Sequence, residues 1–240
     1  MLLVDIGNTR TKYIQQDRLG IDAPSVILNS ELSESWLEHN WQKILPDNSP
    51  TASKNNNAIY LVCVAQAPLV LLLQQWCDNN NIQLHQISSE KSRFGLTSFY
   101  KVPKQLGADR WLALLGAKSL YPEKNLLIVD AGTATTIDCL QNNGQHKGGW
   151  ILPGIDMMFN SLLADTAQVK AEQKVEAQLT FGESSSENVN HATWAATLGM
   201  IEQAVNQAIK IGCKPQLLLI IGGNGKPLYA LMESSMHNGS

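Results

Sequence analysis

The chain has 240 residues, a formal net charge of -3 at pH 7, 44% hydrophobic residues and 16% charged residues. This length can bury a sizeable core in one large domain or two small ones, and the composition is that of an ordinary globular protein. The slightly acidic balance provides no broad basic surface for a phosphate backbone, so we expect no nucleic acid partner.

The cysteines are scattered and lack the close spacing of a zinc site or a disulfide framework; they are Cys63, Cys77, Cys139 and Cys213. Most lie in or beside apolar runs, where a reduced cysteine behaves as a small buried hydrophobe. The sequence starts at "MLLVDIG" without a basic leader, and it shows no apolar span of membrane length. We therefore expect a cytoplasmic protein with no membrane association.

The first half of the chain predicts alternating strands and helices. An apolar run at 1–6, a turn at 7–9 and a partly alternating segment at 10–16 predict a hairpin. A helix is predicted over 31–45, because the larger apolar residues of this segment share one helical face. The following segments are predicted as a polar loop (49–57), a buried strand (58–65), a helix (68–80), a strand (82–88) and a helix (106–120).

The second half repeats the beginning of the first. A strand is predicted at 125–130, a turn at 131–133, strands at 134–140 and 146–152 around a hairpin turn, a long helix in 187–211, a buried strand at 217–223 and a closing helix at 226–236. "VDIGNTR" around Asp5 and "VDAGTAT" around Asp130 each open a strand–turn–strand. This repeat predicts a duplicated α/β unit: two lobes with mixed sheets flanked by helices, at residues 1–115 and 116–240, facing one cleft.

The two acidic turns have the chemistry of phosphate binding. Glycine in a tight turn lets an anion approach backbone N–H groups, and Asn8, Thr9 and Thr133 add side-chain donors. An aspartate beside a phosphate would repel it without a cation, so Asp5 and Asp130 favour magnesium with a nucleotide. A single Asp-x-Gly turn is more often structural, because Asp caps turns, but two such turns favour phosphate binding.

Two further segments bear on function. "LLLIIGGNG" (217–225) ends a buried strand in a glycine loop, whereas the Walker A and GxGxxG patterns are both missing. Asp109 and Arg110 stand at the start of the predicted helix over 106–120. This pair is either an ordinary salt bridge at a helix N-terminus or a general base beside a cation that orients an acidic co-substrate, and spacing alone leaves both open.

Six motifs occur in a fixed order along the chain: "DIGNTRTK", "YxxPxxLGADR" (100–110), "VDAGTATTID", "GGWILPG", "FGESSSENV" and "IIGGNG". In this order they resemble the motifs of type III pantothenate kinases, over residues 1 to about 230. The resemblance implies an actin-like ATPase fold with two ribonuclease-H-like lobes. It also implies that ATP and pantothenate react to give 4'-phosphopantothenate, the first step of coenzyme A biosynthesis.

The resemblance further implies a role for individual residues. The ATP-binding residues are Asp5, Ile6, Gly7, Asn8, Thr9, Arg10, Thr11, Lys12 and Thr133, with Asp5 also tied to the Mg²⁺ that accompanies ATP. The pantothenate-binding residues are Tyr100, Gly107, Ala108, Asp109, Arg110 and Ser185, and Asp109 is the catalytic base. Asp130 binds a monovalent cation, K⁺ or NH₄⁺, in place of the magnesium suggested by its turn alone.

In the family, a threonine at the position of Ser185 reaches a neighbouring subunit's substrate, so a homodimer is expected; Ser184 and Ser186 are alternatives for this role. Ala192 stands where the family usually has glycine, and Asn224 where aspartate is frequent. Two other functions compete with the pantothenate kinase: a kinase for another small alcohol, and a non-catalytic or accessory regulator that retains the kinase fold.

Overall fold

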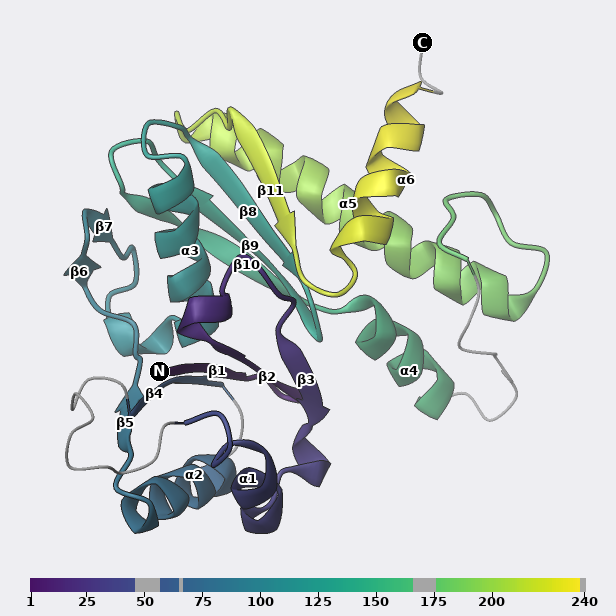
Figure 1. Ribbon diagram of the computed structural model, residues 1–240. Helices are drawn as coiled ribbons and strands as arrows, with labels where there is room; N and C mark the ends of the chain where they lie inside the picture. The colour runs from purple at the N-terminus through teal and green to yellow at the C-terminus, as the bar shows by residue number, and fades with distance from the viewer. Residues whose placement is uncertain (46–56, 65–66, 166–175, 238–240) are drawn as a thin grey trace. The chain divides into compact units, whose positions relative to one another are not determined.

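A computed structural model (Figure 1) describes residues 1–45, 57–64, 67–165 and 176–237. The predicted loop at 49–57 lies outside these residues, except for its last position. The chain forms two compact units, one of residues 1–89 and 104–111 and the other of residues 90–103 and 112–240. The domain boundary between residues 115 and 116 stays a prediction.

The first unit contains a five-stranded mixed sheet in the order β3-β2-β1-β4-β5. The strands are β1 Leu2–Ile6, β2 Arg10–Gln15, β3 Ser25–Leu28, β4 Ala58–Cys63 and β5 Gln83–Gln86. The pairs β1–β2 and β2–β3 are antiparallel, and β1–β4 and β4–β5 are parallel. Helices α1 Glu34–Asn40 and α2 Ala67–Asn79 lie together beside this sheet in Figure 1.

Alternation along β1 decides which face of this sheet carries the Asp5 carboxylate. Leu2, Val4 and Ile6 are buried in the core with side chains of α1 and α2, whereas Leu3 and Asp5 point to the opposite face and are only partly buried. Successive residues of a strand face opposite sides, so the same apolar pattern that anchors β1 presents Asp5 away from the core.

The helix predicted over 31–45 is shorter than expected. The Ser33 hydroxyl accepts a hydrogen bond from the Trp36 N–H (3.3 Å), so the helix begins after this cap, and it ends at Asn40. Trp41 and Leu45 lie beyond the helix but are still buried in the same core. The apolar pattern therefore predicted burial correctly and helix length incorrectly.

The second unit contains a four-stranded sheet in the order β10-β9-β8-β11. Its strands are β8 Leu126–Ala131, β9 Ala134–Leu140, β10 His146–Pro153 and β11 Leu217–Ile221. The pairs β8–β9 and β9–β10 are antiparallel, and β8–β11 is parallel. The helices that accompany these strands are α4 Ile155–Asp165, α5 Ser185–Lys210 and α6 Gly225–His237.

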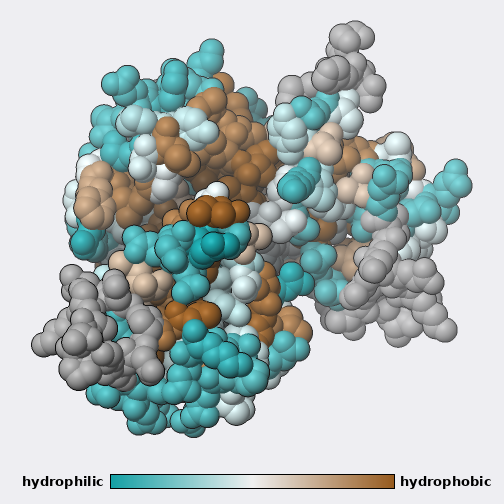
Figure 2. All heavy atoms as spheres, viewed as in Figure 1, coloured by the Kyte–Doolittle hydropathy of each residue, from teal (hydrophilic) through white to brown (hydrophobic). Residues whose placement is uncertain are grey.

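Strand β8 is one of the two inner strands of this sheet and lies between β9 and β11. All of its residues are buried except Asp130, which is half-buried at the end of the strand. Leu127 and Val129 pack in one core with Trp194 and Leu198 of α5. Figure 2 shows hydrophobic atoms at the surface over this unit's sheet, where the edge strand β11 is only partly covered.

The two sheets share one strand order, because β3-β2-β1-β4 corresponds to β10-β9-β8-β11 with the same parallel and antiparallel pairs. The predicted α/β class with two duplicated, mixed-sheet units is confirmed. Within the described ranges, no helix is long and apolar enough to span a bilayer.

Several elements were not predicted from the sequence. These are β3, α4, the short hairpin of β6 Ser92–Arg93 and β7 Leu96–Thr97, and the 3-10 helices Gln16–Arg18, Asn29–Glu31 and Pro103–Gln105. The helix predicted over 106–120 is α3, Ala108–Leu120, and its first residues belong to the first unit.

Candidate active site

The first acidic turn connects β1 to β2. Asp5 pairs with Lys12 across the two strands, and residues 7–10 form the connection after the last pair of Ile6 and Thr11. The Gly7 N–H donates to the Arg10 carbonyl oxygen (3.0 Å), while Asn8, Thr9 and Arg10 are exposed. The turn therefore offers exposed polar groups to a ligand, with a carboxylate and an ammonium group on adjacent strands.

Asn29, the first residue after β3, stabilises this turn through hydrogen bonds. Its side-chain amide donates to the Gly7 carbonyl oxygen (2.7 Å), and its side-chain oxygen accepts from the Thr11 hydroxyl (2.8 Å). Its backbone N–H donates to the Thr9 carbonyl oxygen (3.0 Å). One side chain thus satisfies polar groups on both sides of the turn and fixes its shape.

The Asp5 carboxyl group has an unusual electrostatic environment. Burial raises the pKa of Asp5 above its ordinary value of 3.8, the Lys12 charge lowers it, and the charge of Asp109 raises it again. The two carboxylates belong to the same unit and lie close enough to interact. Like charges held together in this way favour a bound cation.

Asp109 lies in the first turn of α3, where the helix dipole favours a negative charge. Its Oδ1 accepts a hydrogen bond from the Arg110 N–H (2.7 Å) and would lie 2.5 Å from a Cβ at position 107. Glycine at 107 therefore leaves room for the carboxylate. The Ser89 hydroxyl donates to the Leu106 carbonyl oxygen (2.7 Å) and ties the segment before the helix to the end of the first sheet.

Arg110 follows Asp109 and is buried, with only 5% of its surface exposed. The Oδ1 atom of Asp109 accepts a hydrogen bond from the backbone N–H of Arg110. This bond holds the Asp109 carboxylate against the backbone at the start of α3.

The second acidic turn connects β8 to β9 and is one residue shorter. Ala131 pairs with Thr135, so that only residues 132–134 form the connection, and Thr133 is exposed. The Gly154 N–H donates to the Thr133 carbonyl oxygen (3.0 Å), as the Asn29 N–H does to Thr9 in the first turn. Gly154 is thus the counterpart of Asn29.

This counterpart must be glycine, because a Cβ at position 154 would collide with the carbonyl oxygens of Gly132 and Thr133. Thr135 corresponds to Thr11 and is fully buried, and its hydroxyl has no hydrogen-bond partner among the residues that the structure describes. The two turns therefore share a backbone plan but differ in support. The first rests on a side chain, and the second closes directly on backbone.

The glycine loop after β11 packs against the end of β8. Gly222 has a φ of +92°, and a Cβ there would lie 2.5 Å from Asp130 Oδ1 and 2.6 Å from the Ala131 carbonyl oxygen. The Asn224 N–H donates to that carbonyl oxygen (2.9 Å). The glycine is therefore required for two reasons: its backbone conformation and its contact with the Asp130 carboxylate.

The "FGESSSENV" segment distinguishes three neighbouring serines. The Ser184 hydroxyl caps α5 by accepting from the Glu187 N–H (3.2 Å). The Ser186 hydroxyl oxygen is buried, and Ser185 is exposed. Of the three, Ser185 combines an exposed side chain with a hydroxyl group that caps no helix.

The predicted site residues divide between the two units. The first unit brings residues 5–12 together with Gly107, Ala108, Asp109 and Arg110; the second holds Tyr100, Asp130, Thr133 and Ser185. No three His, Cys, Asp or Glu side chains of the described residues group as a metal site. A magnesium ion held by one or two carboxylates and by nucleotide phosphates needs no such group.

Sequence reasoning missed Asn29, the supporting role of Gly154, and a buried pair of Asp138 and His146. "GGWILPG" is one of the motifs of the sequence, but nothing in its residues indicates that its last glycine, Gly154, hydrogen-bonds the turn between β8 and β9. Asn29 carried no signal, because its position depends on the pairing of β3 with β2.

Comparison with known proteins finds one family along most of the chain. The family model of type III pantothenate kinase matches residues 1–207. A type III pantothenate kinase of Colwellia psychrerythraea is 43% identical over 232 residues, covering 97% of this chain and 88% of the relative. One of Pseudoalteromonas translucida is 31% identical over 235 residues, covering 98% and 89%.

Among solved structures, a Campylobacter jejuni protein titled as a member of the Baf family of transcriptional activators superposes with a TM-score of 0.56 at 18% identity, covering 99% of this chain and 96% of that one. At this identity the likeness concerns the fold alone. The sequence matches extend over nearly the whole chain and include both acidic turns and the start of α3. The chain belongs to the type III pantothenate kinase family.

Proposed function

We propose that this chain carries out the family's reaction with the residues at the ends of β1 and β8 and at the start of α3. The reaction is ATP-dependent phosphorylation of pantothenate to 4'-phosphopantothenate, the first step of coenzyme A biosynthesis, and it follows from family membership. The observation that best supports the residue assignment is the interaction of Asp5 with Asp109, which joins a phosphate-type turn to a candidate base within one unit.

The segment from Asp5 to Lys12 binds the ATP phosphates. Gly7 and the exposed Asn8 and Thr9 supply donors, and Lys12 supplies a positive charge opposite Asp5. Asp5 holds the Mg²⁺ that accompanies ATP, and the ion's charge compensates the repulsion between Asp5, Asp109 and the phosphates. A magnesium ion held there with ATP would supply positive charge that offsets the negative charge on the phosphates during transfer.

Asp109 is the general base. Its Oδ1 is held by the Arg110 N–H (2.7 Å), which leaves Oδ2 for the substrate. The carboxylate accepts the proton of the pantothenate hydroxyl as its oxygen bonds to the γ-phosphorus, and the bond from that phosphorus to ADP breaks. The Arg110 guanidinium binds the carboxylate of pantothenate, and Tyr100, Gly107 and Ala108 line the remainder of the substrate.

Asp130 binds the monovalent cation, K⁺ or NH₄⁺, and Thr133 binds the ATP phosphates. A carboxylate and the backbone carbonyl oxygens around Gly132 and Gly222 are hard oxygen donors suited to such an ion. A side chain at position 222 would collide with the Asp130 carboxylate, because its Cβ would lie 2.5 Å from Asp130 Oδ1.

Ser185 reaches the pantothenate bound by a second copy of the chain, so the enzyme is a homodimer. Its exposure supports this role, whereas Ser184 is engaged in capping α5 and Ser186 turns its hydroxyl oxygen inward.

We also place the enzyme in the cytoplasm. Burial raises the pKa of Cys77 to about 12, so this thiol suits a structural role in a reducing compartment.

The test of the base is Asp109→Asn, which keeps the shape of the side chain and removes its basicity. We expect pantothenate-dependent ATP turnover to fall by at least about 100-fold, with the melting temperature nearly unchanged. Asp156→Asn is the matched control, because Asp156 also lies in the first turn of a helix and is exposed. Full activity of Asp109→Asn would refute the assignment.

A further inference from the structure

A buried histidine and aspartate form a hydrogen-bonded pair in the second unit, outside the residues assigned to the reaction. His146 Nε2 and Asp138 Oδ1 are 2.8 Å apart, and the two residues are 1% and 3% exposed. His146 opens β10 and pairs with Leu140 of β9, while Asp138 is two residues from Leu140 on the same face. Alternate residues of a strand share a face, which brings the two side chains together as diagonal neighbours.

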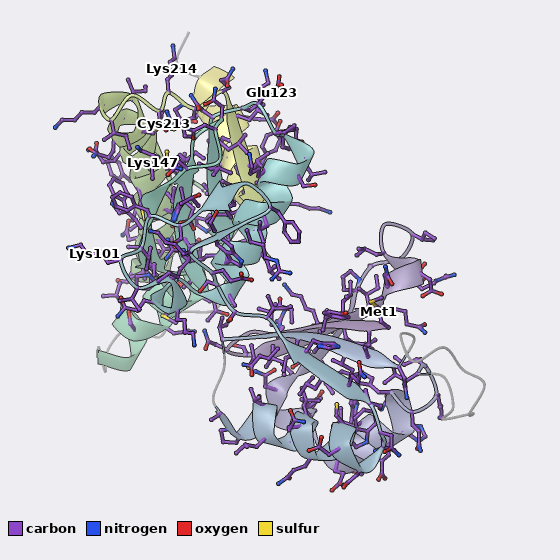
Figure 3. All side chains as sticks on the ribbon, turned by 90° about the vertical axis from the view of Figure 1, so that its left-hand side faces the viewer. Met1, Lys101, Glu123, Lys147, Cys213 and Lys214 are labelled. Atoms are coloured by element: carbon purple, nitrogen blue, oxygen red, sulfur yellow. The ribbon has the colours of Figure 1, made fainter. Side chains whose placement is uncertain are left out.

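The ring of Tyr100 stacks on the imidazole of this histidine. The centroids of the two rings are 6.1 Å apart and their planes differ by 13°. The segment that carries Tyr100 is tied to the same hairpin, because the Thr97 N–H donates to the Gly144 carbonyl oxygen (2.9 Å). Figure 3 labels Lys101 and Lys147, the chain neighbours of Tyr100 and His146, and both lie on this unit.

Local hydrogen bonds fix the backbone of Tyr100 as well. Its N–H donates to the Ser98 hydroxyl oxygen (3.2 Å), and the Lys91 ammonium donates to the Ser98 carbonyl oxygen (2.9 Å) and the Tyr100 carbonyl oxygen (3.4 Å). With the backbone held, the stacked imidazole is a further restraint on the orientation of the Tyr100 ring.

A purely structural role explains this histidine poorly. Its Nδ1 is buried and has no hydrogen-bond partner within the described part of the chain. An unpaired buried polar atom destabilises the fold, and an apolar residue at this position would avoid that penalty. What the histidine adds is a flat ring whose orientation is fixed by a hydrogen bond to Asp138.

We propose that His146, oriented by Asp138, is a positioning residue for pantothenate that acts by holding the Tyr100 ring against its imidazole. The proposal rests on the role of Tyr100 in the pantothenate site. His146 does not contact the substrate; it sets the orientation of a side chain that does.

Two variants separate the ring from the hydrogen bond. His146→Gln keeps a donor for Asp138 and removes the ring, and we expect its pantothenate KM to rise about three- to tenfold, with kcat within about twofold and the ATP KM unchanged. His146→Phe keeps a stacking ring without that donor, and we expect it to restore most of the pantothenate affinity at a lower melting temperature. A purely structural role predicts the reverse order, with His146→Gln the milder variant.

The matched control is His85→Gln in the first unit, where His85 stacks on Tyr60 with the ring centroids 4.8 Å apart. We expect no change in its pantothenate KM. Tyr100→Ala distinguishes the two possible failures. If Tyr100→Ala leaves the pantothenate KM unchanged, the assignment of Tyr100 to the substrate site fails. If Tyr100→Ala raises the KM but His146→Gln does not, only the proposal for His146 is overturned.

A double variant completes the test. In the Tyr100→Ala background, His146→Gln has no further effect on the pantothenate KM if the histidine acts through the Tyr100 ring. Additive effects of the two substitutions would show that His146 acts by another route and would overturn the proposal.

Discussion

The side-chain amide of Asn29 donates a hydrogen bond to the carbonyl oxygen of Gly7, at 2.7 Å. Its side-chain oxygen accepts from the Thr11 hydroxyl, so that the residue directly after β3 stabilises the turn after Asp5 on both sides. The corresponding residue under the second turn is Gly154, which has no side chain to offer. The duplicated turns have therefore diverged in the residue that supports them, in line with the different ions proposed for Asp5 and Asp130.

Asn29→Ala tests whether this support matters for ATP. The variant loses the bonds to Gly7 and Thr11, so we expect the ATP KM to rise about tenfold as the phosphate-binding turn loosens. The melting temperature should also fall by roughly 2–6 °C, because a buried hydroxyl loses its partner. The control is Asn40→Ala, which removes a similar amide bond to the Trp36 carbonyl oxygen within α1. An unchanged ATP KM in Asn29→Ala would contradict the supporting role.

Asp5→Asn should make the protein more stable near neutral pH while abolishing its activity. Because burial raises the pKa of Asp5 above 3.8, the folded state binds more protons than the unfolded state between 3.8 and the raised value. Stability is therefore greatest below that window and falls as the pH rises through it. Removing the carboxylate should raise the melting temperature by roughly 1–3 °C at pH 8.

Thermal unfolding at several pH values checks this prediction. The stabilisation by Asp5→Asn should shrink as the pH falls toward 4, because the native Asp5 then becomes protonated and uncharged. Glu38→Gln, an exposed substitution on α1, provides the comparison and should give no pH-dependent difference. A lower melting temperature of Asp5→Asn at pH 8 would show that Asp5 is stabilised rather than strained by its surroundings.

Ser184 and Ser185 should respond differently to replacement by alanine. Ser184→Ala removes the cap of α5, so we expect a loss of about 0.5–2 kcal/mol in unfolding free energy and an unchanged pantothenate KM. Ser185→Ala should leave stability unchanged and raise the pantothenate KM about five- to tenfold, because one hydrogen bond to substrate is lost. Kinetics and denaturant unfolding of both variants distinguish capping from substrate binding.

Mixing two inactive or weakened variants tests the proposed dimer. If Ser185 completes the partner's site, a mixed dimer of Asp109→Asn and Ser185→Ala contains one complete site, because the Ser185→Ala copy keeps its base and receives an intact serine. We expect refolded mixtures to regain a low pantothenate KM at this site. Activity equal to the average of the two separate variants would exclude sharing of Ser185 between copies.

Neighbouring glycines of the loop after β11 offer a matched test at Asp130. Gly222→Ala places a methyl group 2.5 Å from Asp130 Oδ1 in a backbone conformation with φ of +92°, so we expect lower stability and a several-fold higher potassium concentration for half-maximal activity. Gly223→Ala meets no atom within 4 Å and should change neither quantity. An unchanged potassium requirement in folded Gly222→Ala would argue against a cation at Asp130.

The features that could be predicted from the sequence are those with local signals. The apolar runs ending in Asp5 and Asp130 and the glycines after them identified β1, β8 and their turns, since strand burial and turn chemistry are both read within a few residues. Strand β3 was missed because only Ile27 of its residues is buried, so the strand depends on pairing with β2 rather than on its own pattern.

The supporting side chains depend on contacts between distant residues. Asn29 reaches Gly7 only because β3 pairs with β2, and no spacing between positions 7 and 29 indicates this contact. His146 and Asp138 meet across a hairpin whose register shifts between His146 and Gly149. Such a shift cannot be read from the sequence, so a histidine without ligand spacing offered no reason to expect a role.

The most direct test of the account is ATP consumption by the purified chain with and without pantothenate, in potassium, ammonium and sodium buffers. We expect pantothenate to stimulate ADP release and the formation of 4'-phosphopantothenate in potassium or ammonium, with a much lower rate when sodium replaces them. The absence of pantothenate-stimulated turnover in potassium would contradict the account.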